Sequence, residues 1–215
     1  MRRIIKAGSS MAMVALLSFI ISGCTVIIQK GRRTDIEKIT QLKSELSELE
    51  RAKAELEDRL KKEIADKEVK VEMLARGLVI TFVSEVLFDS GKAKLRPESL
   101  EKLNKVAGVL KTTVKDLNVG IEGHTDNMPI KYSGWKSNWE LSSARAMSVL
   151  HHLADEQQIE PNRLSGTGYG EYRPVAPNDA AEGRQKNRRV EIVILPKATK
   201  EKPGEPVAVS EEDLK

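Results

Sequence analysis

Apolar residues recur every three or four positions from about residue 35 to residue 75, in a segment without glycine or proline. This spacing is that of the a and d positions of a coiled coil, and it predicts a helical spacer over residues 35–76, roughly 60 Å long at 1.5 Å per residue. Lys53 and Glu63 interrupt the seam. A short parallel homodimer and a single solvated helix with pairs such as Glu57 to Lys61 therefore both remain open. The seam consists of Ile39, Leu42, Leu46, Leu49, Leu56 and Leu60.

From residue 77 the pattern changes to short apolar runs that alternate with amphipathic stretches. The runs predict four strands, over residues 78–87, 119–123, 163–167 and 190–195. Pro97 opens a predicted helix, residues 138–158 predict a second, and residues 178–187 are expected to form a polar loop or a short helix. This order indicates an α/β fold, a βαβαββ two-layer sandwich over residues 77–196. Residues 197–215 lack an apolar period and are expected to form a disordered tail.

The first 23 residues predict an export signal. A basic start is followed by the apolar run Met11–Ile21, and Ile21-Ser22-Gly23-Cys24 resembles the lipobox of bacterial lipoproteins. On this interpretation the mature chain begins at Cys24, whose thiol carries the lipid, and residues 24–34 link the anchor to the helix. A lone cysteine suits this chemistry, because a thioether needs no disulfide partner.

Two locations in a bacterial envelope follow from this start. If Cys24 is acylated, Thr25 implies the periplasmic face of the outer membrane, by analogy with other lipoproteins. The alternative is a single-pass inner-membrane protein, because Met11–Ile28 is eighteen largely apolar residues, at the short end of what spans a bilayer. In that case the coiled coil recruits a protein partner. Acylation at Cys24 separates the two.

Charge excludes nucleic acid as the ligand. The chain has 36 basic and 32 acidic residues, a formal net charge of +4, but three of the basic residues, Arg2, Arg3 and Lys6, lie in the export signal. Without them 33 basic residues face 32 acidic ones. A net charge of +1 does not supply the cationic excess on which binding to phosphate backbones depends.

Four motifs of the C-terminal domain carry a family resemblance. Val86–Gly91, Glu122–Asp126, Asn138–Ala146 and Asn187–Ile192 follow in the order of the OmpA-like peptidoglycan-binding domain, which residues 78–196 resemble as a whole. The resemblance implies non-covalent binding to cell-wall stem peptides: an Asp receives the ammonium of diaminopimelate and an Arg holds a carboxylate. By position these are Asp126 and Arg145. The other candidate peptidoglycan-binding residues are Asp89, Thr125, Asn138, Leu141, Arg188 and Arg189.

The residue types fit such a ligand. A zwitterionic group needs one anion and one cation, and a guanidinium binds a carboxylate through two parallel hydrogen bonds. Asn138 and Arg145 are seven residues apart, two helical turns, so they lie on one side of the predicted helix. Arg188 and Arg189 point to opposite sides of an extended segment, so only one of them can easily face the ligand.

The loop over residues 127–137 is longer than the family's common pattern and resembles that of the flagellar-stator branch. A stator needs a membrane-embedded carboxylate to carry protons, and Met11–Ile28 contains none, so we do not expect motor function. The sequence therefore predicts a lipid-anchored outer-membrane protein that tethers the membrane to peptidoglycan. Peptidoglycan and the membrane are the expected partners, together with a second copy of the chain if the seam forms a homodimer.

No enzyme, metal ion or cofactor is expected. His124 and Asp126 have no third ligand at a helical or hairpin spacing, and His151 and His152 diverge by about 100° on a helix. The glycine-rich run over residues 166–170 lacks the Lys-Ser or Lys-Thr end of a phosphate-binding loop and is expected to be a turn.

Overall fold

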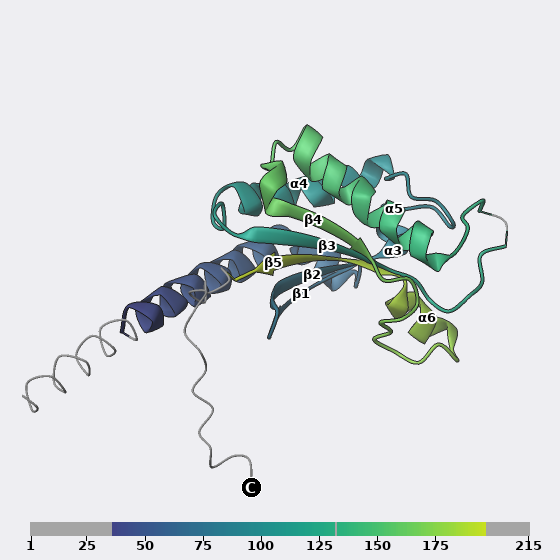
Figure 1. Ribbon diagram of the computed structural model, residues 1–215, viewed down its shortest axis with the longest axis horizontal. Coiled ribbons are helices and arrows are strands. Elements are labelled where there is room, and N and C mark those ends of the chain that lie inside the picture. Colours follow the sequence, from purple (N-terminus) through teal and green to yellow (C-terminus); the bar gives the residue numbers. More distant parts are fainter. Residues whose placement is uncertain (1–35, 132, 197–215) are drawn as a thin grey trace, which may run out of the picture. The chain divides into compact units, whose positions relative to one another are not determined.

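The structure is a computed structural model that describes residues 36–131 and 133–196 (Figure 1). The chain divides into two compact units, residues 1–47 and 48–215. Residues 36–47 of the first unit and residues 48–59 of the second are helical. The remaining elements are α2 (Lys61–Ala65), β1 (Val69–Leu74), β2 (Gly77–Val83), α3 (Ser84–Leu87), α4 (Pro97–Lys111), β3 (Asn118–His124), α5 (Asn138–His151), a π-helix (His152–Glu156), a 3₁₀ turn (Pro161–Arg163), β4 (Leu164–Gly168), α6 (Ala181–Asn187) and β5 (Arg189–Leu195).

The second unit is a five-stranded sheet covered by helices. The strand order is β1-β2-β5-β3-β4, in which only the β3–β4 pair is parallel. Helices α4 and α5 lie over the same face of the sheet (Figure 1). Alternate strand residues such as Ile80, Ile121 and Ile192 point into the core under these helices and are fully buried. The predicted two-layer α/β fold is confirmed, and the four predicted strands correspond to β2, β3, β4 and β5.

The predicted extent of the helical spacer is wrong at its C-terminal end. The backbone leaves the helix at Lys67, which has a φ of 58° and donates its N–H to the Ile64 carbonyl. The edge strand β1 follows and pairs antiparallel with β2. Its β-branched Val69 and Val71 are buried, whereas Lys70 between them is exposed. This period of two selects a strand despite the helix-forming Lys and Glu residues around it.

The predicted coiled-coil seam is divided between two environments. Leu49, Leu56 and Leu60 are 0–4% exposed and belong to the core of the α/β unit. Polar contacts hold the same segment against α4 and the turn after it: Lys105 pairs with Glu63 at 2.6 Å, and the Thr113 hydroxyl contacts Glu55. These leucines therefore pack inside their own domain and are not available to a second helix.

The seam residues of the first unit are more exposed than those of the second. Ile39, Leu42 and Leu46 are about half exposed. The homodimer through this seam remains a prediction, now confined to three apolar positions.

Cys24, the export signal and the tail over residues 197–215 lie outside the described residues. None of the helices in the described part of the chain is both long and apolar enough to cross a membrane.

The glycine-rich run over residues 166–170 was predicted to be a turn. This prediction is wrong for the first part of the run, which forms the end of β4. Its glycines allow α5 to approach the sheet. A Cβ on Gly168 would lie 2.3 Å from the Ser143 backbone nitrogen, and a Cβ on Gly123 of β3 would lie 2.1 Å from the Ser142 carbonyl oxygen. This close approach fixes the position of α5, which carries three of the candidate site residues, Asn138, Leu141 and Arg145.

Candidate functional site

A pocket of about 540 Å³ opens at the carboxyl end of β3. Ligand sites of α/β sheets commonly lie beyond this end of the strands. Segments far apart in the sequence meet here: α3 and the turn after it, the end of β3, the loop before α5, the first two turns of α5, and the residue after α6. The lining residues are Ser84, Glu85, Phe88, Ser90, Gly91, Thr125, Asp126, Met128, Pro129, Ile130, Lys131, Ser133, Asn138, Leu141, Arg145 and Arg188.

Asp126 is buried and supplies the negative charge of the pocket floor. One carboxylate oxygen accepts the Met128 N–H at 3.1 Å, and the other lies 2.7 Å from the Arg188 guanidinium. Arg188 also binds Glu85 of α3, at 2.5 Å. Burial lowers the pKa of Arg188, but the hydrogen bonds to Asp126 and Glu85 outweigh it and raise that pKa overall. Arg188 therefore stays charged and joins two carboxylates at the pocket.

Arg145 supplies a second positive charge and is only 4% exposed. Its Nε donates to the Lys92 carbonyl at 2.9 Å, and its guanidinium lies 5.2 Å from the centre of the Phe88 ring. Arg145 takes part in none of the ion pairs found in the described part of the chain. Burial lowers its pKa to about 10, so the guanidinium remains charged at neutral pH. The pocket thus contains a cation without a bound carboxylate.

Asn138 orients the start of α5 beside the pocket. Its side-chain amide donates to the Glu171 carboxylate at 2.8 Å and to the Met128 carbonyl at 3.1 Å. Thr125 and Leu141 are buried and also line the pocket. The Thr125 hydroxyl has no hydrogen-bond partner among the described residues. It is a buried polar group available to a ligand.

Two of the sequence candidates do not present their side chains to the pocket. Asp89 contributes only its carbonyl, 3.5 Å from Arg145, while its carboxylate pairs with Lys92 at 3.2 Å. Arg189 is buried at the start of β5, where its Nε lies 2.6 Å from Glu191. The two consecutive arginines thus diverge as expected, and Arg188 is the one that lines the pocket.

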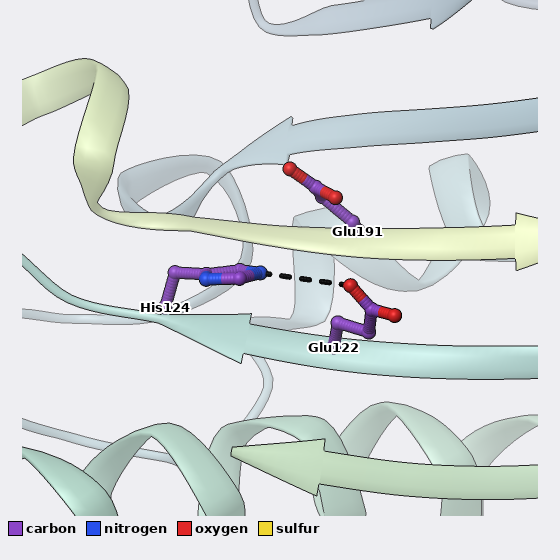
Figure 2. A group of neighbouring side chains, drawn as sticks. All are labelled: Glu122, His124 and Glu191. Carbon is purple, nitrogen blue, oxygen red and sulfur yellow. Dashed lines mark ion pairs between the residues drawn. The ribbon is translucent and has the colours of Figure 1, made fainter. Parts of the chain in front are cut away.

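A second charged cluster surrounds Arg189, formed by neighbouring positions of β3 and β5. Figure 2 shows Glu122, His124 and Glu191, whose side-chain ligand atoms lie within 4.8 Å of one another. The two carboxylates already have cationic partners, because Arg76 binds both of them and Arg189 binds Glu191. Because β3 pairs with β5, Glu191 lies beside Glu122 and His124. The spacing of residues within β3 alone could not reveal this third potential ligand. We interpret this cluster as a charge-balanced structural network.

Protonation of His124 is expected to destabilise the fold. Its ring is 2% exposed and stacks on Tyr169, and neither ring nitrogen has a hydrogen-bond partner within the described ranges. Burial lowers its pKa below 6.5, although Glu122 partly opposes this shift. Because the unfolded chain then takes up the proton first, the stabilising contribution is complete above pH 6.5 and decreases as the pH falls below it. The loss is at most about 1.4 kcal/mol per pH unit.

Urea unfolding of the full chain at pH 7, 6 and 5 checks this expectation. His124→Asn should flatten the decrease in unfolding free energy between pH 7 and 5. His152→Gln should flatten it too, because burial also lowers the pKa of His152. His151→Gln serves as the control, since His151 is exposed. An unchanged pH dependence in the His124 variant would contradict the assignment of this decrease to His124.

The two carboxylates of the cluster do not contribute to this decrease. The pKa values of Glu122 and Glu191 are lowered in the fold, so their contributions to the free energy of unfolding are lost only below about pH 4.5.

Sequence reasoning did not identify Glu85 and Glu171. Glu85 lies in the four-residue helix α3, and Glu171 follows the glycine-rich run. Neither residue belongs to a motif or a periodic pattern that distinguishes it from an ordinary surface carboxylate. Both become recognisable only through their contacts with Arg188 and Asn138.

The fold and the pocket define an α/β ligand-binding domain in which oppositely charged side chains converge beyond the end of a sheet strand. Residues 87–188 match the model of the OmpA family, and the chain belongs to this family. Motility protein B of Bacillus subtilis is 42% identical over 154 residues, which are 72% of this chain and 59% of that protein. The chain therefore spans less than two thirds of this relative.

Two solved structures extend the comparison. A putative MotB-like protein from Desulfovibrio vulgaris has a TM-score of 0.66 and 28% identity, over 73% of this chain and 99% of that one. The cell wall anchor of the T6SS from Pseudomonas aeruginosa has a TM-score of 0.59 and 36% identity, over 66% and 96% of the respective chains. The predicted resemblance to the OmpA-like domain, and to its flagellar-stator branch, is confirmed.

Proposed function

We propose that this protein tethers a bacterial membrane to the cell wall by binding diaminopimelate in peptidoglycan stem peptides. One observation carries the proposal: a buried guanidinium, that of Arg145, lies in the same pocket as the Asp126 carboxylate and has no carboxylate partner within the described part of the chain. A ligand carboxylate would satisfy Arg145 and an ammonium would bind at Asp126. Binding, not catalysis, is the activity that this arrangement supports.

Arg188 already occupies one side of the Asp126 carboxylate, to which the ligand ammonium would bind. In the free protein it holds Asp126 at 2.7 Å, so a ligand ammonium has to share or displace this contact. Glu85 holds the other side of the same guanidinium. Arg188 therefore gives both carboxylates a cationic partner before the ligand enters, which limits the cost of burying Asp126.

The anchor belongs to the same proposal. Acylation of Cys24 would place the protein on the periplasmic face of the outer membrane, and residues 36–47 would separate the lipid from the domain. A single-pass inner-membrane protein is the second candidate, favoured by the 42% identity to motility protein B. Mass spectrometry of the purified full chain distinguishes them: a chain starting at Cys24 with added acyl mass supports the lipoprotein, and an unmodified Cys24 in an uncleaved chain supports the alternative.

The binding experiment is co-sedimentation of the full-length protein with isolated peptidoglycan sacculi. Wild-type protein should sediment with the sacculi, and Asp126→Asn and Arg145→Gln should each weaken binding about tenfold or more, because a hydrogen bond to a charged group contributes about 1.5–3 kcal/mol. Asp58→Asn and Arg59→Gln remove the same charges from exposed positions outside the pocket and should have no effect. Wild-type protein that stays in the supernatant would overturn the proposal.

Competition identifies the ligand group. A soluble stem peptide that contains diaminopimelate should release the protein from sacculi, whereas the same peptide with lysine in its place should be much weaker. Equal competition by both peptides would remove Arg145 from the recognition step, because the α-groups are then in peptide bonds and only the diaminopimelate side chain ends in a carboxylate beside its ammonium.

A further inference from the structure

Two aromatic side chains outside the pocket are stacked on each other and yet exposed. The ring centroids of Trp139 and Tyr172 are 5.1 Å apart with an interplanar angle of 23°. Trp139 is 46% exposed and Tyr172 is 65% exposed. Large aromatic rings normally bury their faces, and exposed ones commonly mark a binding surface.

The backbone around both rings is fixed by hydrogen bonds. Trp139 lies in the first turn of α5, where its N–H donates to the Ser137 hydroxyl at 3.1 Å. Tyr172 follows Glu171, whose carboxylate accepts the Asn138 amide at 2.8 Å, and its own N–H donates to the Tyr169 carbonyl at 3.2 Å. The pair is therefore ordered before any ligand arrives, which lowers the entropic cost of binding.

The pair borders the proposed stem-peptide site. Asn138, which lines the pocket, is the residue before Trp139. Asn138 donates to Glu171 at 2.8 Å, and each ring belongs to the residue that follows one of these two partners. From Arg145 to Trp139 the helix axis rises by about 9 Å, although the two side chains leave α5 about 120° apart, and three extended peptide residues span about 10 Å. A stem peptide held at Arg145 and directed toward the start of α5 would therefore bring its sugar to the neighbourhood of the pair.

We propose that Trp139 and Tyr172 form a second subsite, which stacks against a sugar ring of the peptidoglycan glycan strand. The subsite rests on the proposed stem-peptide binding. A pyranose ring presents axial C–H groups on its face, and these complement the negative face of an aromatic ring. Glu140, Glu171 and Arg173 are the neighbours of the two rings in sequence, so polar side chains adjoin the apolar surface of the pair.

The test compares two soluble ligands of the full-length protein: a stem tetrapeptide, and the same peptide carrying its disaccharide. Wild-type protein should bind the disaccharide-peptide about tenfold more tightly than the bare peptide. Trp139→Ala and Tyr172→Ala should each lose this difference while binding the bare peptide unchanged. Trp139→Phe should retain most of it, and Val175→Ala, at another exposed apolar position, should retain all of it.

Tryptophan fluorescence gives an independent readout. The disaccharide-peptide should change the emission of wild-type protein and of a Trp135→Phe variant, but not that of Trp139→Phe. Equal wild-type affinity for the two ligands overturns the subsite and leaves stem-peptide binding standing. Variants that weaken both ligands equally also overturn it, because the rings would then only support the fold. Wild-type protein that binds neither ligand overturns the proposed function together with the subsite.

Discussion

Gly123→Ala is expected to destabilise the protein by about 3 kcal/mol or more and to abolish ligand binding. The new Cβ would lie 2.1 Å from the Ser142 carbonyl oxygen and 2.8 Å from its carbonyl carbon. Both are backbone atoms of α5, which no side-chain rotation can move. The helix must shift away from β3, and Asn138 and Arg145 shift with it. Such overpacking against backbone belongs to the upper range of single-residue effects.

The same strand provides the control for this substitution. A Cβ on Gly120 would meet only ordinary contacts, 3.7 Å from the Ser165 hydroxyl and 4.0 Å from the Val193 Cβ. Gly120→Ala should therefore leave the urea midpoint of the full chain nearly unchanged. Similar midpoints for Gly120→Ala and Gly123→Ala would contradict the close approach of α5 to the sheet.

Leu56→Ala is expected to lower the free energy of unfolding by about 2–5 kcal/mol, the range for large-to-small changes in a core. Leu56 is fully buried in the core of the α/β unit. Leu42→Ala, at a half-exposed position of the same heptad pattern, should change it by less than about 0.5 kcal/mol. Urea unfolding of the full chain measures both values.

Protein concentration separates the two interpretations of the seam. A coiled-coil dimer predicts a midpoint that rises with concentration and a comparable loss for the two leucine variants. Packing within the domain predicts a large loss for Leu56→Ala at every concentration. A neutral Leu56→Ala variant would contradict the assignment of residues 48–60 to the domain core.

The strands and helices of the domain could be predicted because their signals are local. Alternating or continuous β-branched runs mark β2 and β5, and Pro97 marks the first turn of α4. Edge strand β1 was missed because Lys and Glu, which favour helices, surround its two valines. The heptad spacing marked a helix face that is buried at Leu49, Leu56 and Leu60 but half exposed at its first three positions, and it could not identify the surface that covers the buried part.

In the candidate site, too, local motifs could be recognised from the sequence, whereas contacts between distant segments could not. The motifs predicted Asp126, Asn138 and Arg145, which the fold brings to one pocket, and the alternation of an extended segment predicted that Arg188 and Arg189 diverge, as they do. Glu85 could not be identified, because its role depends on a contact with Arg188, 103 positions away along the chain. Contacts between distant segments leave no trace in the spacing of a single sequence.

The packing of residues 48–65 against the domain also determines how the domain would bear mechanical load. A pull applied at the N-terminal side enters through this helical segment and continues along the chain into β1, the edge of the sheet. A ligand held in the pocket resists at the end of β3. Between the two lie the β1–β2, β2–β5 and β5–β3 hydrogen-bond ladders, all antiparallel. In the proposed tether, tension between a membrane and the wall would therefore pass through three strand pairings, and its strength would depend on the sheet as much as on the pocket.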